Sequence, residues 1–88
     1  MEPYDVIFKP SVEKDLRRLP ADAAARIMTR VDQLGAEPLG RGSVKLAGGK
    51  HLYRVRVGDY RVVYAVDSDA RQVLIHYVRH RRDVYRSL

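Results

Sequence analysis

The apolar positions follow two different periods along the chain, and the change of period predicts its elements. Residues 4–8, YDVIF, are aromatic and β-branched, which predicts a first strand. Apolar residues then recur at helical spacing, and we expect a first helix with Ser11 as its N-cap that ends at Pro20. The stripe from Ala24 to Leu34, at i, i+3, i+4, i+7 and i+10, predicts a longer second helix with Gly35 as its C-terminal cap.

The second half of the chain alternates as strands do. Residues 36–50, AEPLGRGSVKLAGGK, contain four glycines and a proline, and we expect a connector with a short strand at residues 43–46. HLYRVRV and YRVVYAV flank Gly58-Asp59, which is typical of a hairpin turn, and QVLIHYV follows the polar turn DSDAR. This order predicts one α+β domain over residues 1–88, with an N-terminal strand and a two-helix hairpin packed on an antiparallel β-sheet meander.

The hairpin turn also predicts which side chains share a face. Counting back from it, Arg56 pairs with Arg61, and partners lie on the same side of a sheet. The face toward the helices is then Tyr53, Val55, Val57, Tyr60, Val62 and Tyr64. Arg54, Arg56 and Arg61 share the other face. Because opposed like charges cost up to about 1 kcal/mol, we interpret this arrangement as an anion-binding face. Splayed, solvated arginines are the alternative.

Composition narrows the class of protein. The 88 residues carry a net charge of +6 with a sequence pI near 10.0, which favours a polyanionic partner such as nucleic acid. The absence of cysteine excludes disulfides, thiolate catalysis and cysteine-type zinc sites. The first residues, MEPYDVIFK, do not resemble a signal peptide, and no apolar run approaches the roughly 20 residues of a membrane helix. We therefore expect a soluble cytoplasmic protein with no membrane partner.

The densest charge lies in VRHRRDVY, near the C-terminus, and the meander brings it towards Arg61. No carboxylate pair or metal-ligand cluster accompanies it, so we expect neither a metal nor a cofactor. Asp67 and Asp69 are interpreted as turn residues, and His51 and His76 as structural or exposed ones. The candidate binding residues are Arg54, Arg56, Arg79 and Arg82, and the candidate catalytic residues are Arg61, Arg81, His80 and Tyr85.

These residue types suit attack by an RNA 2′-OH on its adjacent phosphate, because RNA supplies its own nucleophile. Arg61 and Arg81 would stabilise the charge that develops on the phosphorane. Neighbouring cations would favour the neutral form of His80, which can then accept a proton. Tyr85 would stack on a base or hydrogen-bond to the RNA backbone.

The chain resembles the RelE/ParE family of toxins from type II toxin–antitoxin systems, and it lies closer to the RelE branch. The resemblance rests on KPSVEKDLRRLP, YRVRVGDYRVVYAV and VRHRRDVY. It implies a RelE-like fold, metal-independent cleavage of mRNA in the ribosomal A site, and neutralisation by a RelB-like cognate antitoxin that is acidic where it covers the arginines. By position, Arg61 matches the phosphate-stabilising arginine, Arg81 a second arginine proposed as general acid, and Tyr85 the tyrosine that engages mRNA.

One departure from the resemblance keeps other functions open. Arg54 and Arg56 stand where RelE has lysines, and an arginine cannot release its proton to become a base. His80 is therefore our candidate base. A non-enzymatic gyrase inhibitor of ParE type is one alternative reading, and a basic nucleic-acid-binding module without toxicity is another.

Overall fold

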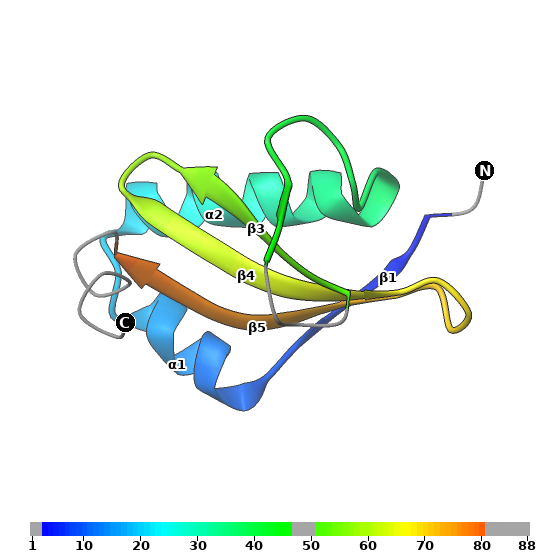
Figure 1. Cartoon of the computed structure of the whole chain (residues 1–88). Helices are drawn as coiled ribbons and strands as arrows, with labels where there is room; N and C mark the ends of the chain where they lie inside the picture. Colours follow the sequence, from blue (N-terminus) through cyan, green and yellow to red (C-terminus); the bar gives the residue numbers. More distant parts are fainter. Residues whose placement is uncertain (1–2, 47–50, 81–88) are drawn as a thin grey trace.

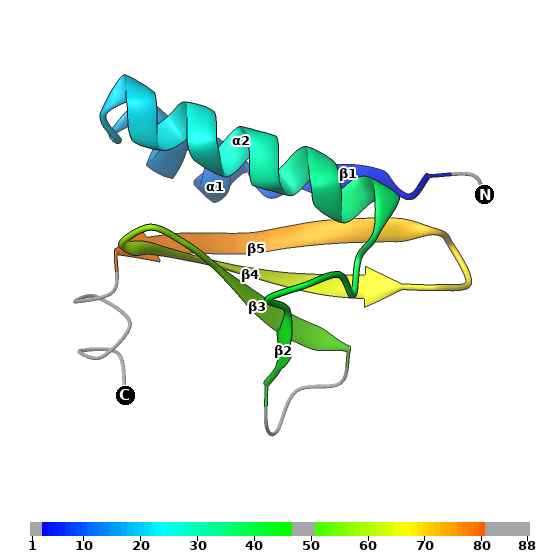
Figure 2. The same cartoon turned by 90° about the horizontal axis from the view of Figure 1, so that it is seen from above.

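The computed structural model describes residues 3–46 and 51–80. Its elements run in the order β1 (Asp5–Phe8), α1 (Pro10–Arg17), α2 (Ala21–Ala36), β2 (Val44–Lys45), β3 (Leu52–Val57), β4 (Tyr60–Asp67) and β5 (Gln72–His80). The strands form one sheet in the order β1-β5-β4-β3-β2. α1 and α2 both lie on one side of this sheet, as Figures 1 and 2 show, so neither of these helices covers its other face.

The predicted α+β architecture and its antiparallel meander are confirmed from β2 to β5. The N-terminal strand adds a feature that the sequence pattern did not specify. β1 pairs with β5 in parallel, Asp5 with Gln72 through Phe8 with Ile75, so the sheet is mixed. The two helices between β1 and the meander supply the long connection that a parallel pair requires.

The helix ends differ from two sequence-based expectations. Pro10, not Ser11, opens α1, with Lys9 at the N-cap position and no side-chain cap. Proline suits the first helical position because its fixed φ is helical and its missing N–H would have no partner there. Gly35 does not cap α2, which continues to Ala36. A Cβ at Gly35 would lie only 3.2 Å from Val6 Cγ2, so this glycine allows β1 to pack closely against the helix.

The core lies between the helices and the sheet. Its buried members include Val12 from α1, Ile27, Val31 and Leu34 from α2, and Val55, Val62, Tyr64, Val73 and Ile75 from the strands. Tyr64 is fully buried, and its hydroxyl donates a 2.7 Å hydrogen bond to the Pro38 carbonyl in the connector. The predicted helix-facing row is therefore confirmed, and its packing fixes which side chains point away from the helices.

Candidate functional site

The β3–β4 hairpin has the register that the Gly58-Asp59 turn predicts. Val57 pairs with Tyr60, Arg56 with Arg61 and Arg54 with Val63. Gly58 has a φ of 58°, a left-handed conformation that glycine adopts without the strain a side chain would bring. Because side chains alternate between the faces of a strand, Arg54, Arg56 and Arg61 all lie on the face opposite α1 and α2.

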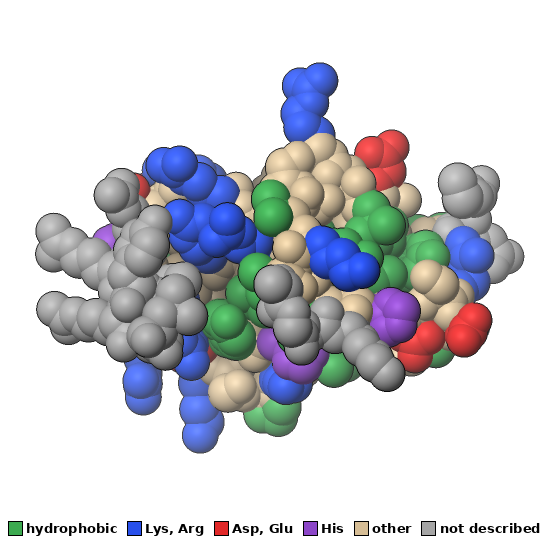
Figure 3. Space-filling model, viewed as in Figure 1, with side chains coloured by type: hydrophobic (Ala, Val, Ile, Leu, Met, Phe, Trp, Pro, Cys, Tyr) green, Lys and Arg blue, Asp and Glu red, His purple; other side chains and the backbone are tan. Residues whose placement is uncertain are grey.

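The β4–β5 pairing adds a fourth arginine to this face. Arg61 pairs with Arg79, and Val62, its neighbour on the helix side, pairs with Val78. We call Arg54, Arg56, Arg61 and Arg79 the arginine face. Figure 3 looks onto this side of the sheet and shows basic side chains gathered over the end where β3 turns into β4. Four guanidinium groups on one face form a strong site for anions, since each can donate to two phosphate oxygens at once.

The arginines are not equally available to a ligand. Arg56 is exposed, and its Nε donates to the Gly58 carbonyl at 2.9 Å. Arg79 is held towards α1, where its Nη1 lies 2.7 Å from Asp15 Oδ2, and its guanidinium carbon lies 5.2 Å from the centre of the Tyr77 ring. Arg54 and Arg61 are half-buried. Arg54 and Arg56 are therefore better placed for phosphate than Arg79, whose charge Asp15 partly offsets.

His80 lies in a different row from the arginine face. It pairs with Tyr60, and the two rings meet edge to face with their centres 5.3 Å apart. Because Tyr60 belongs to the helix-facing row, this register places His80 on the other side of the sheet from Arg61. The sequence did not show which face the C-terminal strand end would present. Arg81, Arg82 and Tyr85 lie outside the described residues.

A second histidine, His76, which we interpreted from the sequence as structural or exposed, lies beside a cation. His76 Nδ1 is 2.8 Å from Lys9 Nζ, and the lysine can only donate, so the imidazole accepts as its neutral form. Burial and, to a smaller extent, the Lys9 charge lower the pKa of His76 below its ordinary 6.5. His76 is the extra residue of a bulge in β5, because Val63 pairs with Tyr77 while Tyr64 pairs with Ile75. No local sequence pattern announces that bulge.

Metal chemistry has no visible support in residues 3–46 and 51–80. That part of the chain contains no group of three or more His, Asp or Glu side chains placed to hold a metal ion. Asp67 serves the β4–β5 turn, where its Oδ1 accepts the Ala70 amide at 3.0 Å, as the turn prediction requires. No helix of the described residues is long and apolar enough to cross a membrane.

Comparisons with known proteins identify the family. The family described as "ParE toxin of type II toxin-antitoxin system, parDE" matches residues 6–85. Toxin RelG of Mycobacterium tuberculosis is 35% identical over 88 residues, covering 96% of this chain and 98% of the relative. Toxin RelE of the same organism is also 35% identical, and the alignment covers 96% of this chain and 88% of that relative.

Solved structures show the same fold. The archaeal RelE–RelB complex from Pyrococcus horikoshii contains a chain that aligns with a TM-score of 0.81 at 35% identity, covering 92% of this chain and 97% of that one. The RelBE2 toxin–antitoxin complex from Mycobacterium tuberculosis aligns with a TM-score of 0.80 at 32% identity, covering 91% and 93%. The protein therefore belongs to the RelE/ParE family of type II toxin–antitoxin toxins, with a RelE-type fold.

Proposed function

We propose that this toxin is a metal-independent endoribonuclease that cleaves mRNA on the ribosome and so inhibits translation. The observation that carries the proposal is the arginine face, where Arg54, Arg56 and Arg61 gather on a sheet surface that neither α1 nor α2 covers. Opposed arginines lower stability, so their place on this face is best explained by an anionic ligand. Two relatives carry the names RelE and RelG, and ribonuclease activity is consistent with that naming.

The reaction needs three contributions from the protein. It must align the 2′-OH with the adjacent phosphate, stabilise the charge of the phosphorane, and move two protons. We assign charge stabilisation to Arg61 and Arg81, binding to Arg54, Arg56, Arg79 and Arg82, and base contact to Tyr85. Neither Arg54 nor Arg56 can release a proton to become a base. His80 pairs with Tyr60 in the helix-facing row, so we assign the proton acceptor to none of these three residues. No metal or cofactor takes part in this proposal.

Cell-free translation offers the direct test. Primer extension on a translated mRNA should show cuts at fixed positions within codons when the toxin is added, and no cuts when ribosomes are absent. Arg61→Ala should reduce cleavage roughly 100-fold, the usual cost of removing one donor to a developing oxyanion. Arg17→Ala is the matched control, since Arg17 is an exposed arginine on α1, away from the arginine face. Equal cleavage by both variants would remove Arg61 from the site.

Gyrase inhibition is the second candidate function. The family that matches residues 6–85 is named for ParE, and the arginines at positions 54 and 56 leave the lysines of RelE unmatched. A supercoiling assay with purified toxin separates the two. Inhibited gyrase with unaffected translation would select the ParE-type function, whereas cut mRNA with unaffected gyrase would select the ribonuclease.

A cognate antitoxin of RelB type completes the proposal. The solved relatives named above are complexes of RelE with RelB, and this chain shares their fold over more than nine-tenths of its length. The antitoxin is expected to be acidic where it covers the arginine face, because complementary charge speeds association. We propose that toxin and antitoxin meet in the cytoplasm, where the mRNA and ribosomes are also found.

A further inference from the structure

The open face of the sheet, away from the helices, is organised in rows that run across the strands. Residues that pair with one another point to the same side, so the registers define each row. At one end lies the basic row Arg56, Arg61 and Arg79. At the other end lies a row with two carboxylates, Asp67, Gln72 and Asp5. Two rows lie between these ends. Arg54, Val63 and Tyr77 lie next to the basic row, and an apolar row follows, Leu52, Ala65, Leu74 and Ile7, which we call the apolar band.

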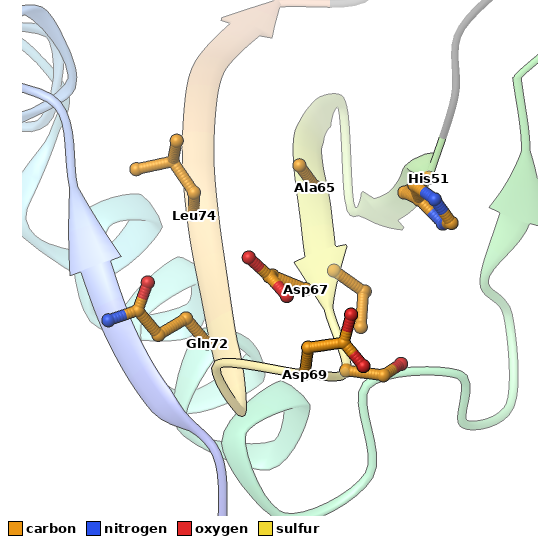
Figure 4. A pocket seen from close by; sticks show the side chains of 8 residues that line it. His51, Ala65, Asp67, Asp69, Gln72 and Leu74 are labelled. Carbon is orange, nitrogen blue, oxygen red and sulfur yellow. The ribbon is translucent and has the colours of Figure 1, made fainter.

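A hollow marks the acidic end of this face. Its lining includes Asp67 at the end of β4 and Asp69 in the β4–β5 turn, with Leu74 and Ala65 from the apolar band. Figure 4 shows the Asp67 side chain between Gln72 and Ala65, with Asp69 beyond it at the turn. An apolar wall with carboxylates at its rim fits a side chain with an aliphatic stem and a cationic end, which is the chemistry of lysine or arginine.

The two ends of the open face therefore have opposite charge. Figure 3 shows acidic side chains at the β4–β5 turn, on the opposite side of this surface from the basic cluster. Arg61 and Asp67 are six positions apart on β4, a distance of about 20 Å at the rise of a strand. An RNA strand laid along the whole face would bring phosphates against Asp67 and Asp69. A polypeptide of mixed charge has no such conflict.

The exposed apolar area of the open face also favours a polypeptide over RNA as its ligand. Ile7, at the β1 end of the apolar band, is 40% exposed although it is one of the large hydrophobic residues. Leu74, beside it on β5, is only half-buried. Burying apolar area of this kind is the main driving force of protein association. Nothing on an RNA backbone would cover the apolar band equally well.

We propose that this face docks one amphipathic segment of the antitoxin, and that the charge order of the face sets its direction. Acidic side chains of the segment meet the arginine face, apolar side chains lie on the apolar band, and a lysine or arginine about 20 Å away enters the hollow at Asp67 and Asp69. The inference rests on the proposed toxin–antitoxin pairing. It adds the lysine or arginine in the hollow, which we call the basic anchor. The segment spans about 6 residues when extended, or about 13 when helical.

Paired charge variants test the anchor. In the double variant Asp67→Asn/Asp69→Asn the side chain at position 67 keeps an Oδ1 that can accept the Ala70 amide, so the turn is retained. The matched control is Glu13→Gln/Asp32→Asn, which changes the net charge equally with exposed residues on the two helices. The probe is the full-length antitoxin, defined as the chain whose co-expression restores growth. Its dissociation from each toxin is measured by surface plasmon resonance at two salt concentrations.

We expect the Asp67/Asp69 variant to lose the antitoxin about three to ten times faster than the unmodified toxin at low salt, with a smaller difference at high salt. The helix variant should dissociate at the unmodified rate. Equal dissociation of both variants would overturn the basic anchor. mRNA cleavage by the free Asp67/Asp69 variant, measured alongside, should stay unchanged. Absence of cleavage by the unmodified toxin would overturn the proposed function without touching the docking result.

The apolar band has its own test. The chain has no cysteine, so Ile7→Cys introduces a single thiol at the edge of the band. Alkylation of that thiol should slow at least tenfold when the antitoxin is bound. An unchanged rate would overturn docking across the band. A second copy of this chain is the competing occupant of the apolar band, and sedimentation of the toxin alone tests for it. If the toxin forms a dimer and Ile7→Asp dissociates that dimer, the band belongs to the second copy and not to the antitoxin.

Discussion

At the level of single residues, Lys9 and His76 show how one contact sets a protonation state. The lysine donates to His76 Nδ1 at 2.8 Å, and a protonated imidazole would lose that bond and face a like charge. Burial and the nearby Lys9 charge together lower the pKa of His76. The folded protein therefore binds this proton less readily than the unfolded chain. The stability that this histidine contributes is complete above its ordinary pKa of 6.5 and declines as the pH falls below it.

Lys9→Met should raise the pKa of His76 part of the way back to its ordinary value. The recovery is only partial, because burial is the larger cause of the shift and remains in the variant. The titration of the imidazole Cε1 proton by NMR gives this pKa directly. Lys14→Met, at an exposed lysine of α1, removes the same charge without a contact to His76 and should leave the titration in place. Identical curves for the two variants would contradict the role assigned to Lys9.

At the level of elements, the contact between β1 and α2 depends on a residue without a side chain. A Cβ at Gly35 would lie 3.2 Å from Val6 Cγ2 and 3.3 Å from the Tyr4 carbonyl oxygen. Tyr4 also donates its amide to the Gly35 carbonyl at 2.7 Å, so the strand cannot easily withdraw. Crowding in a packed contact of this kind costs about 1–3 kcal/mol. The better helix propensity of alanine offsets up to about 1 kcal/mol of it.

Gly35→Ala should therefore lower the free energy of unfolding, although the same change inside an exposed helix would raise it. Urea denaturation gives the size of the loss. The Val6→Ala background identifies its cause, because a smaller side chain at position 6 should reduce the cost of Gly35→Ala. A cost that is independent of position 6 would place the strain on the Tyr4 carbonyl instead.

The elements also show which parts of the fold a sequence can determine. The hairpin register follows from two local facts, the Gly58-Asp59 turn and the alternation on either side of it, and the structure confirms it pair by pair. The parallel pairing of β1 with β5 joins residues almost 70 positions apart, so no local pattern predicts it. The sequence gives no signal for the β5 bulge at His76, because the nearly continuous apolar run QVLIHYV lacks the alternation that would reveal a change of face.

The candidate site was predictable to the same extent. Arg54, Arg56 and Arg61 could be placed together because the hairpin alone sets their face. Arg79 and His80 depend on the β4–β5 register, and the structure places them on opposite sides. The Arg79–Asp15 ion pair joins residues 64 positions apart, and it forms only after α1 has docked beside β5. Side chains within one hairpin were therefore within reach of sequence analysis, and contacts between distant elements were not.

At the level of the whole molecule, the position of the positive charge matters more than its amount. The net charge is +6, and exposed arginines occur on the helix side as well as on the arginine face. If RNA binds the arginine face, only charges on that face release counterions when it binds. Two double variants with equal net charge should then differ in RNA affinity. Arg54→Gln/Arg56→Gln changes the arginine face, and Arg17→Gln/Arg18→Gln changes exposed residues at the end of α1.

Fluorescence anisotropy with a short single-stranded RNA, repeated at several salt concentrations, measures the difference. Losing two phosphate contacts should flatten the slope of log K against log salt by about 1.4, since each contact with a single strand contributes about 0.7. The Arg17/Arg18 variant should keep the original slope and lose little affinity. If the slope of log K against log salt flattened equally in the two variants, RNA binding would depend on net charge alone. The arginine face would then not be the RNA-binding surface. If the slope flattened only in the α1 variant, the RNA would lie on the helix side of the sheet.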